Sequence, residues 1–155
     1  MSKKTGSDTN TLPDLLSGSL SKWKVDPARV TFEITESAIM IDPERSLRVA
    51  ETLAEMGSRL SIDDFGTGYS SLAYLSQLPA SELKVDRSFV SRMVTSPRDA
   101  TIVQSTIDLA HNLGLEVVAE GIEDQPILDQ LHKIRTFPRN SGEAECQLGE
   151  VFGVV

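Results

Sequence analysis

Acidic side chains recur in or directly after short segments rich in apolar and β-branched residues, and these acids are the residues best suited to chemistry. Each segment has the length and alternation of a β-strand, in which successive side chains point to opposite faces. We therefore expect the charged residues to share one face of a sheet, near the carboxyl ends of its strands. They are Glu33, Asp63, Lys84, Asp86 and Glu120, with Asp64 directly after Asp63.

Four carboxylates on one face repel each other unless cations compensate them, and Lys84 supplies only one positive charge. Mg²⁺ and Mn²⁺ prefer oxygen ligands, and the adjacent Asp63 and Asp64 offer oxygens to two ions. Two ions about 3.5–4 Å apart are the usual arrangement for phosphodiester hydrolysis. The alternative for any single acid is a solvated sheet face, whereas the same placement in four strands favours a site.

Helical and strand patterns alternate along the chain and would position these acids. Asp42 with Pro43, and Ser96 with Pro97, are N-cap and first-turn pairs, while Gly57 and Gly114 are placed to end helices. We expect a helix from residue 12 that stops before Pro27, further helices over 42–57, 70–78, 96–114 and 124–134, and strands over 30–34, 60–63, 83–86 and 116–120.

Strands that alternate with helices predict an α/β fold with a parallel sheet, either a closed barrel or an open doubly wound sheet. A full eight-unit barrel needs about 250 residues, or about 31 per unit, and the chain has 155. We therefore predict a partial TIM-like (β/α) barrel of about five units. Its two strand edges would be exposed, which suggests pairing of two copies or a complementing fragment.

Composition narrows the class of protein. The formal net charge is −8, which disfavours a general grip on a nucleic acid polymer. Cys146 is the single cysteine, so an intrachain disulfide is excluded and a reducing cytoplasm fits. We expect no membrane segment and interpret residues 1–10 as a disordered lead.

Four segments, 32–37, 62–72, 83–90 and 118–123, resemble the EAL domain family in order and spacing, within a resemblance that extends over about 12–131. The segment 62–72, Ile-Asp-Asp-Phe-Gly-Thr-Gly-Tyr-Ser-Ser-Leu, is the most specific of them. The resemblance implies a modified TIM barrel that hydrolyses cyclic di-GMP to linear pGpG with Mg²⁺ or Mn²⁺.

The resemblance also implies roles for individual residues. Lys84 would stabilise charge around the attacked phosphate, and Glu120 would be the general base or a second-metal ligand. Glu123 would be a supporting acid, and Glu36 would anchor the loop Phe65, Gly66, Thr67 and Gly68. The implied metal ligands are Glu33, Asp63, Asp64 and Asp86.

The chain also departs from the family pattern. No Glu-Ala-Leu occurs in it, so the metal ligands that the family carries on earlier strands are absent, and we expect hydrolysis by the isolated chain to be impaired. The tail 135–155 diverges, with a further strand suggested near Val151. The alternative function is a catalytically inactive module that binds cyclic di-GMP or a protein.

Overall fold

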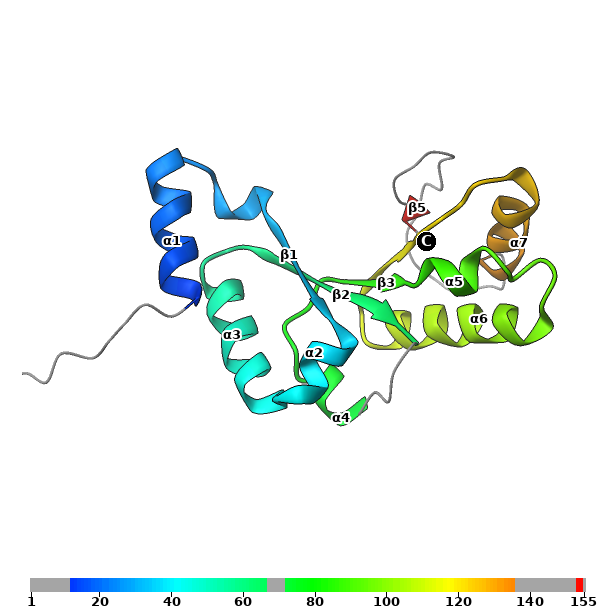
Figure 1. The fold of residues 1–155 in the computed structure, drawn as a ribbon, viewed down its shortest axis with the longest axis horizontal. Helices are drawn as coiled ribbons and strands as arrows, with labels where there is room; N and C mark the ends of the chain where they lie inside the picture. The colour runs from blue at the N-terminus through cyan, green and yellow to red at the C-terminus, as the bar shows by residue number, and fades with distance from the viewer. Residues whose placement is uncertain (1–11, 67–71, 136–152, 155) are drawn as a thin grey trace, which may run out of the picture.

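The computed structural model describes residues 12–66, 72–135 and 153–154, and it consists of a sheet whose first four strands are parallel and alternate with helices (Figure 1). The sheet order is β1-β2-β3-β4-β5. The strands are β1 (Thr31–Thr35), β2 (Arg59–Phe65), β3 (Glu82–Val85), β4 (Glu116–Ala119) and β5 (Gly153–Val154). The α/β partial-barrel class predicted from the sequence is confirmed.

The helices follow the predicted alternation, with three additions, η1, α2 and α5. They are α1 (Leu12–Trp23), the 3₁₀ helix η1 (Pro27–Arg29), α2 (Glu36–Ile41), α3 (Pro43–Glu55), α4 (Leu72–Leu75), α5 (Arg87–Val90), α6 (Pro97–Asn112) and α7 (Gln125–Arg135). The predicted caps are in place: Asp42 accepts a hydrogen bond from the Arg45 amide at 3.0 Å, and Ser96 accepts one from the Asp99 amide at 3.3 Å. These side chains satisfy amides that have no partner inside the helix.

Two short helices, α2 and α5, were not expected from the sequence. Each begins directly after a strand, where a polar side chain caps it: Thr35 accepts from the Ala38 amide at 3.2 Å, and Asp86 accepts from the Ser88 amide at 2.9 Å. Helices of one or two turns show too little periodicity for a pattern to detect. The helix predicted over 70–78 is likewise shorter, since α4 ends at Leu75.

The core lies between the sheet and its helices. Ile62, Leu83 and Val117, one from each of three neighbouring strands, have no exposed surface. Val103 of α6 and Leu131 of α7 are equally buried in the same cluster. Burial of the strands' apolar face beneath helices leaves the acids on the other face, as the alternation predicted.

The two edges of the sheet differ. β5 pairs antiparallel with β4, with Val118 opposite Val154 and Ala119 opposite Gly153. The expectation of two exposed edges is therefore wrong at β4, because a segment from the far end of the chain returns to cover it. Among the described residues, no strand pairs with the outer edge of β1.

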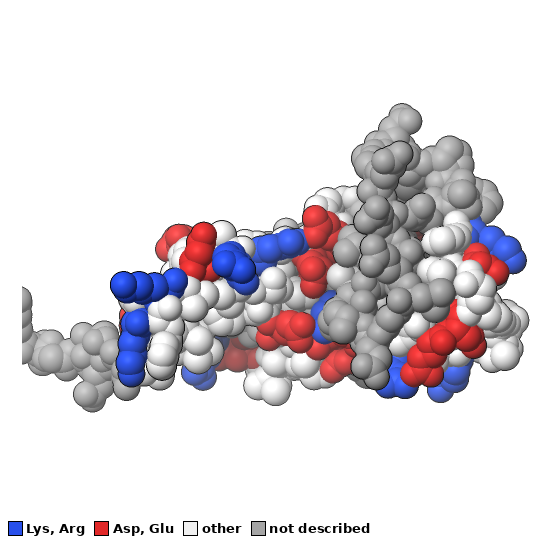
Figure 2. Space-filling model, turned by 90° about the horizontal axis from the view of Figure 1, so that it is seen from above, with Lys and Arg blue, Asp and Glu red and all other residues white. Residues whose placement is uncertain are grey.

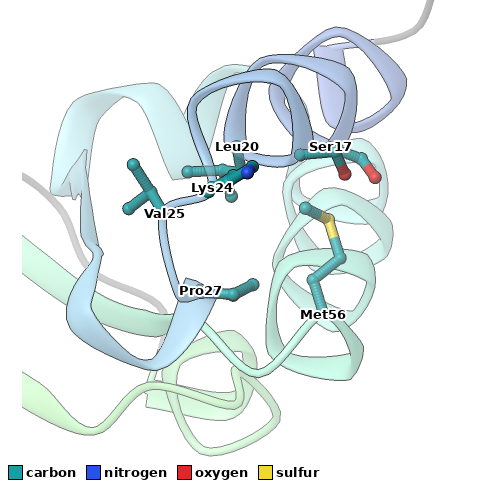
Figure 3. A pocket seen from close by; sticks show the side chains of 7 residues that line it. Ser17, Leu20, Lys24, Val25, Pro27 and Met56 are labelled. Atoms are coloured by element: carbon teal, nitrogen blue, oxygen red, sulfur yellow. The ribbon is translucent and has the colours of Figure 1, made fainter.

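At the amino ends of the strands, an ion pair and a hydrogen bond join neighbouring elements. Arg59 of β2 forms an ion pair with Glu116 of β4 and donates to the Ser81 hydroxyl at 3.3 Å. A cavity of about 300 Å³ lies at the same end, between α1, the segment before β1 and the end of α3 (Figure 3). Leu20 and Met56 are among its lining residues.

No described helix is long and apolar enough to cross a membrane.

Replacing Ser61 with Ala should leave the free energy of unfolding unchanged or raise it by about 1 kcal/mol. The Ser61 side chain is fully buried on β2, and its hydroxyl has no hydrogen-bond partner among the described residues. The matched control is Ser81→Ala, because the Ser81 hydroxyl donates to the Leu60 carbonyl at 3.1 Å and its loss should lower that energy by about 1 kcal/mol. Urea unfolding measures the free energy of unfolding of both variants. A loss above about 1 kcal/mol in Ser61→Ala would show that the Ser61 hydroxyl does have a hydrogen-bond partner.

Candidate functional site

The ammonium group of Lys84 brings carboxylates from three other strands together. Its Nζ lies 3.0 Å from Glu33 Oε1 of β1, 3.4 Å from Asp63 Oδ1 of β2 and 2.6 Å from Glu120 Oε1, directly after β4. The Lys84 side chain is only 6% exposed. Parallel strands whose carboxyl ends meet at one edge make this convergence possible, and the sequence predicted it.

A β-bulge in β2 places Asp64 near the carboxylates of Asp63, Asp86 and Glu120. Ile62 pairs with Leu83 and Phe65 pairs with Val85, so Asp63 and Asp64 together stand opposite Lys84 alone. Asp64 has a φ of 56°, and its amide donates to Asp63 Oδ1 at 2.9 Å. In an unbroken strand Asp64 would face the apolar core; the extra residue of the bulge redirects its side chain.

The carboxylates around Asp64 act on its protonation. Burial raises the pKa of Asp64 above its ordinary value, and the negative charges of Asp63, Asp86 and Glu120, with a hydrogen bond to Asp86, raise it further. Each of these effects disfavours the charged form. This part of the cluster therefore has an excess of negative charge that Lys84 does not neutralise.

Lys84 itself stays charged. Burial lowers its pKa, but hydrogen bonds to Glu120 and Glu33 and the charges of Asp63 and Glu120 outweigh burial, and the net result is a raised pKa. An ammonium with three carboxylate partners is the compensated form of a buried charge. Lys84 is therefore a fixed cation at the carboxyl edge of the sheet.

The donor set suits a hard divalent cation in kind, because it consists of carboxylate oxygens in excess of the available positive charge. The arrangement does not supply a complete ligand set: among the described residues, no group of three His, Cys, Asp or Glu side chains could hold a metal ion. Three of the carboxylates converge on Lys84, and Asp86 Oδ1 accepts hydrogen bonds from Ser88 as the cap of α5.

Glu36 links β1 to the loop that follows β2. Its side chain is fully buried, and its Oε2 accepts a hydrogen bond from the Gly66 amide at 3.0 Å. Gly66 has a φ of 97°, and the preceding Phe65 is buried. This contact lies where the family resemblance puts the loop anchor. Thr67 and Gly68 lie outside the described residues.

Arg87 and Gly121 form a contact at the edge of the site that the sequence did not reveal. Gly121 has a φ of 75°, and a Cβ added there would lie 2.4 Å from Cγ of Arg87. The Arg87 guanidinium also forms an ion pair with Glu123. This ion pair connects the segment after β4 to the first residue of α5. The Gly that follows Glu120 was the available signal, since such a residue often marks a close approach.

Figure 2 views the molecule from above and shows acidic and basic atoms intermixed over the described part of that face. No continuous basic area covers these residues in that view. Such intermixed charge is unlike the basic stripe that binds a nucleic acid backbone.

A family model described as the EAL domain matches residues 2–137 of the chain. The chain belongs to the EAL domain family. This match contains the stretch 12–131 over which the sequence resembled the family.

Individual EAL proteins agree with this assignment. The chain is 46% identical over 114 residues to the bifunctional diguanylate cyclase/cyclic di-GMP phosphodiesterase MucR of Pseudomonas aeruginosa, covering 74% of this chain and 17% of that protein. The solved structure of the PaMucR phosphodiesterase in complex with c-di-GMP superposes with a TM-score of 0.78 at 42% identity, covering 82% of this chain and 51% of that one.

A manganese/cy-diGMP complex of Klebsiella pneumoniae BlrP1 gives a TM-score of 0.68 at 33% identity, covering 78% of this chain and 31% of that one. The chain therefore spans less than a fifth of the length of MucR and about half of the solved MucR chain.

Replacing Gly121 with Ala should destabilise the fold more than replacing Gly114 with Ala. Both glycines have positive φ, 75° and 74°, but only a Cβ at residue 121 meets another atom within 4 Å. Gly114→Ala should cost about 1–2 kcal/mol from the backbone alone, and Gly121→Ala about 1–3 kcal/mol more from overlap with Arg87. In the Arg87→Ala background most of that difference should disappear, because only the Cβ of residue 87, 3.2 Å from the added Cβ, remains. Thermal and urea unfolding measure the difference, and its full persistence in that background would contradict the contact.

Replacing Asp64 with Asn should raise the free energy of unfolding at pH 7. A carboxyl whose folded pKa is raised stabilises the fold below its unfolded pKa, and that contribution is lost as pH rises through the folded value. Asn removes the charge and tolerates the positive φ of this position. The gain should vanish as pH falls below about 3.9, the ordinary value for Asp. Urea unfolding in the presence of EDTA measures this change in the free energy of unfolding. A loss of stability at pH 7 would contradict the inference that negative charge is in excess around Asp64.

Proposed function

We propose that the chain carries part of the site of a metal-dependent phosphodiesterase that hydrolyses cyclic di-GMP to pGpG. The observation that carries the proposal is the meeting of Glu33, Asp63 and Glu120 on Lys84 at the carboxyl edge of the sheet. EAL relatives named as cyclic di-GMP phosphodiesterases support the choice of substrate. The cytoplasm is the compartment that we propose, since a single cysteine suits a reducing environment.

Each residue of the cluster has a proposed part in the reaction. Mg²⁺ or Mn²⁺ would supply an activated water and a stabilised leaving oxygen. Lys84 would hold a positive charge next to the attacked phosphate, and Glu120 would accept a proton from the water. The residues that would hold the ions are Glu33, Asp63, Asp64 and Asp86.

The isolated chain would be impaired, because the described acids do not form a complete ligand set and no Glu-Ala-Leu motif occurs in the sequence. Full activity would then require ligands from outside this chain. We propose that they come from a complementing fragment, with pairing of two copies as the other possibility.

A second function follows from the same incomplete ligand set. A chain that keeps a fixed cation and several acids but lacks metal ligands could bind cyclic di-GMP, or a protein, without hydrolysing it. This catalytically inactive module and the weak enzyme differ in one measurable respect, which is turnover.

Incubating the chain with cyclic di-GMP and Mg²⁺ or Mn²⁺ should release pGpG slowly, as measured by liquid chromatography. Asp63→Ala should reduce the rate by more than about 100-fold, beyond the range for outer partners of metal ligands. Glu44→Ala, which removes an exposed carboxylate of α3, should not change it. Calorimetry separates the remaining outcomes: binding without turnover favours the inactive module, and neither binding nor turnover rejects both functions.

A further inference from the structure

The cavity of about 300 Å³ beside α1 lies at the opposite end of the strands from the acidic cluster. Its described lining comes from α1, the turn that follows α1, η1 and the residue after α3 (Figure 3). These segments lead into β1 and β2, so the cavity is formed by connections within this chain. Its volume is at the lower end of the range for sites that bind small molecules.

Part of the lining is polar. Ser17 and Ser21 are one turn apart on α1, and they line the cavity together with Lys24, which directly follows the helix. Two hydroxyls and an ammonium group supply hydrogen-bond donors and one positive charge. The neighbouring carboxylate of Asp26 caps η1, where it accepts a hydrogen bond from the Ala28 amide at 3.0 Å. In the described part of the chain, no carboxylate forms an ion pair with Lys24.

The rest of the lining is apolar. Leu20, Val25, Pro27 and Met56 contribute it. Val25 is 41% exposed, and the other three are half-buried. An apolar group placed among them would remove this surface from water, and a methionine side chain adapts to occupants of different shapes. The cavity therefore combines an apolar lining with a single positive charge.

Lys24 has a backbone conformation that is unusual for its residue type. Its φ is 53°, in the left-handed region that favours glycine. The Lys24 amide donates to the Ser21 carbonyl at 3.2 Å, and the Val25 amide donates to the Leu20 carbonyl at 3.0 Å. These two bonds are the Schellman ending of a helix, in which glycine is the usual residue at this position. A strained lysine in place of glycine favours a role for its side chain.

We propose that this cavity binds a small monocarboxylate with an apolar chain. Leu20, Pro27 and Met56 would contact the chain. Lys24 and the serine hydroxyls of α1 would bind the carboxylate through charge-assisted hydrogen bonds. One ammonium group balances one negative charge, whereas a phosphate ester carries up to about two. The site is independent of the proposed hydrolysis, because no residue of the acidic cluster lines it.

The test is a titration of the full chain with sodium octanoate in the presence of EDTA, followed by the amide chemical shifts of ¹⁵N-labelled protein. The shifts of Ser21, Lys24 and Met56 should saturate. Acetate, which lacks the chain, should bind at least about tenfold more weakly. Octylammonium has the same chain with the opposite charge and should not shift these amides. The net charge of −8 favours octylammonium in general, so a preference for octanoate would report the local site.

Three variants and a control locate the binding. Lys24→Gln should weaken octanoate binding about three- to fivefold, as expected for an exposed charge pair. Ser21→Trp should abolish the binding by filling the cavity. Lys24→Gly should weaken the binding as Lys24→Gln does, yet it should raise the urea midpoint of unfolding, because glycine relieves the strained φ. The matched control is Lys22→Gln, since the Lys22 ammonium lies over the Trp23 ring, 5.5 Å from its centroid, and does not line the cavity.

Saturating shifts that Lys22→Gln retains, and that the Lys24 and Ser21 variants weaken, support the site. An octanoate titration without saturation overturns it, as do equal shifts with octylammonium or an affinity that Lys24→Gln and Ser21→Trp leave unchanged. An equal loss in Lys22→Gln and Lys24→Gln overturns it in favour of general attraction to basic residues. Circular dichroism establishes that each variant is folded, and the outcome does not depend on whether the chain hydrolyses cyclic di-GMP.

Discussion

The structure depends on one interaction, the ammonium of Lys84 held between carboxylates of different strands. A buried lysine is costly unless it is paired, and the acids that surround it would repel one another without it. Glu33, Asp63 and Glu120 contact it from β1, β2 and the end of β4. Any shift in strand register would separate these partners, so the sheet and the charge cluster constrain each other.

The same interaction leaves part of the charge uncompensated. The bulge redirects Asp64, and burial, together with the negative charges of Asp63, Asp86 and Glu120, raises the pKa of its carboxyl. Bulges next to functional sites commonly redirect a side chain in this way. The raised pKa of Asp64 lowers the stability of the fold at neutral pH, whereas the raised pKa of Lys84 increases it.

The molecule is unequal at its two edges. β4 is paired with β5, whereas no described strand pairs with the outer edge of β1, and Leu12, Leu15 and Trp23 of α1 are exposed. Glu33 lies on β1, so the open edge and the acidic cluster share a strand.

The sequence by itself determined the alternation of strands and helices, the caps at Asp42 and Ser96, and the acids at the ends of strands, because each depends on local periodicity or on neighbours within one turn. Its resemblance to EAL domains also supplied the family, which the family match confirmed. Only the tertiary structure decided that Asp63 and Asp64 both oppose Lys84, that Arg87 lies against Gly121, and that β5 covers β4. These contacts join residues distant in the chain through strand register and backbone displacement, which local pattern does not encode.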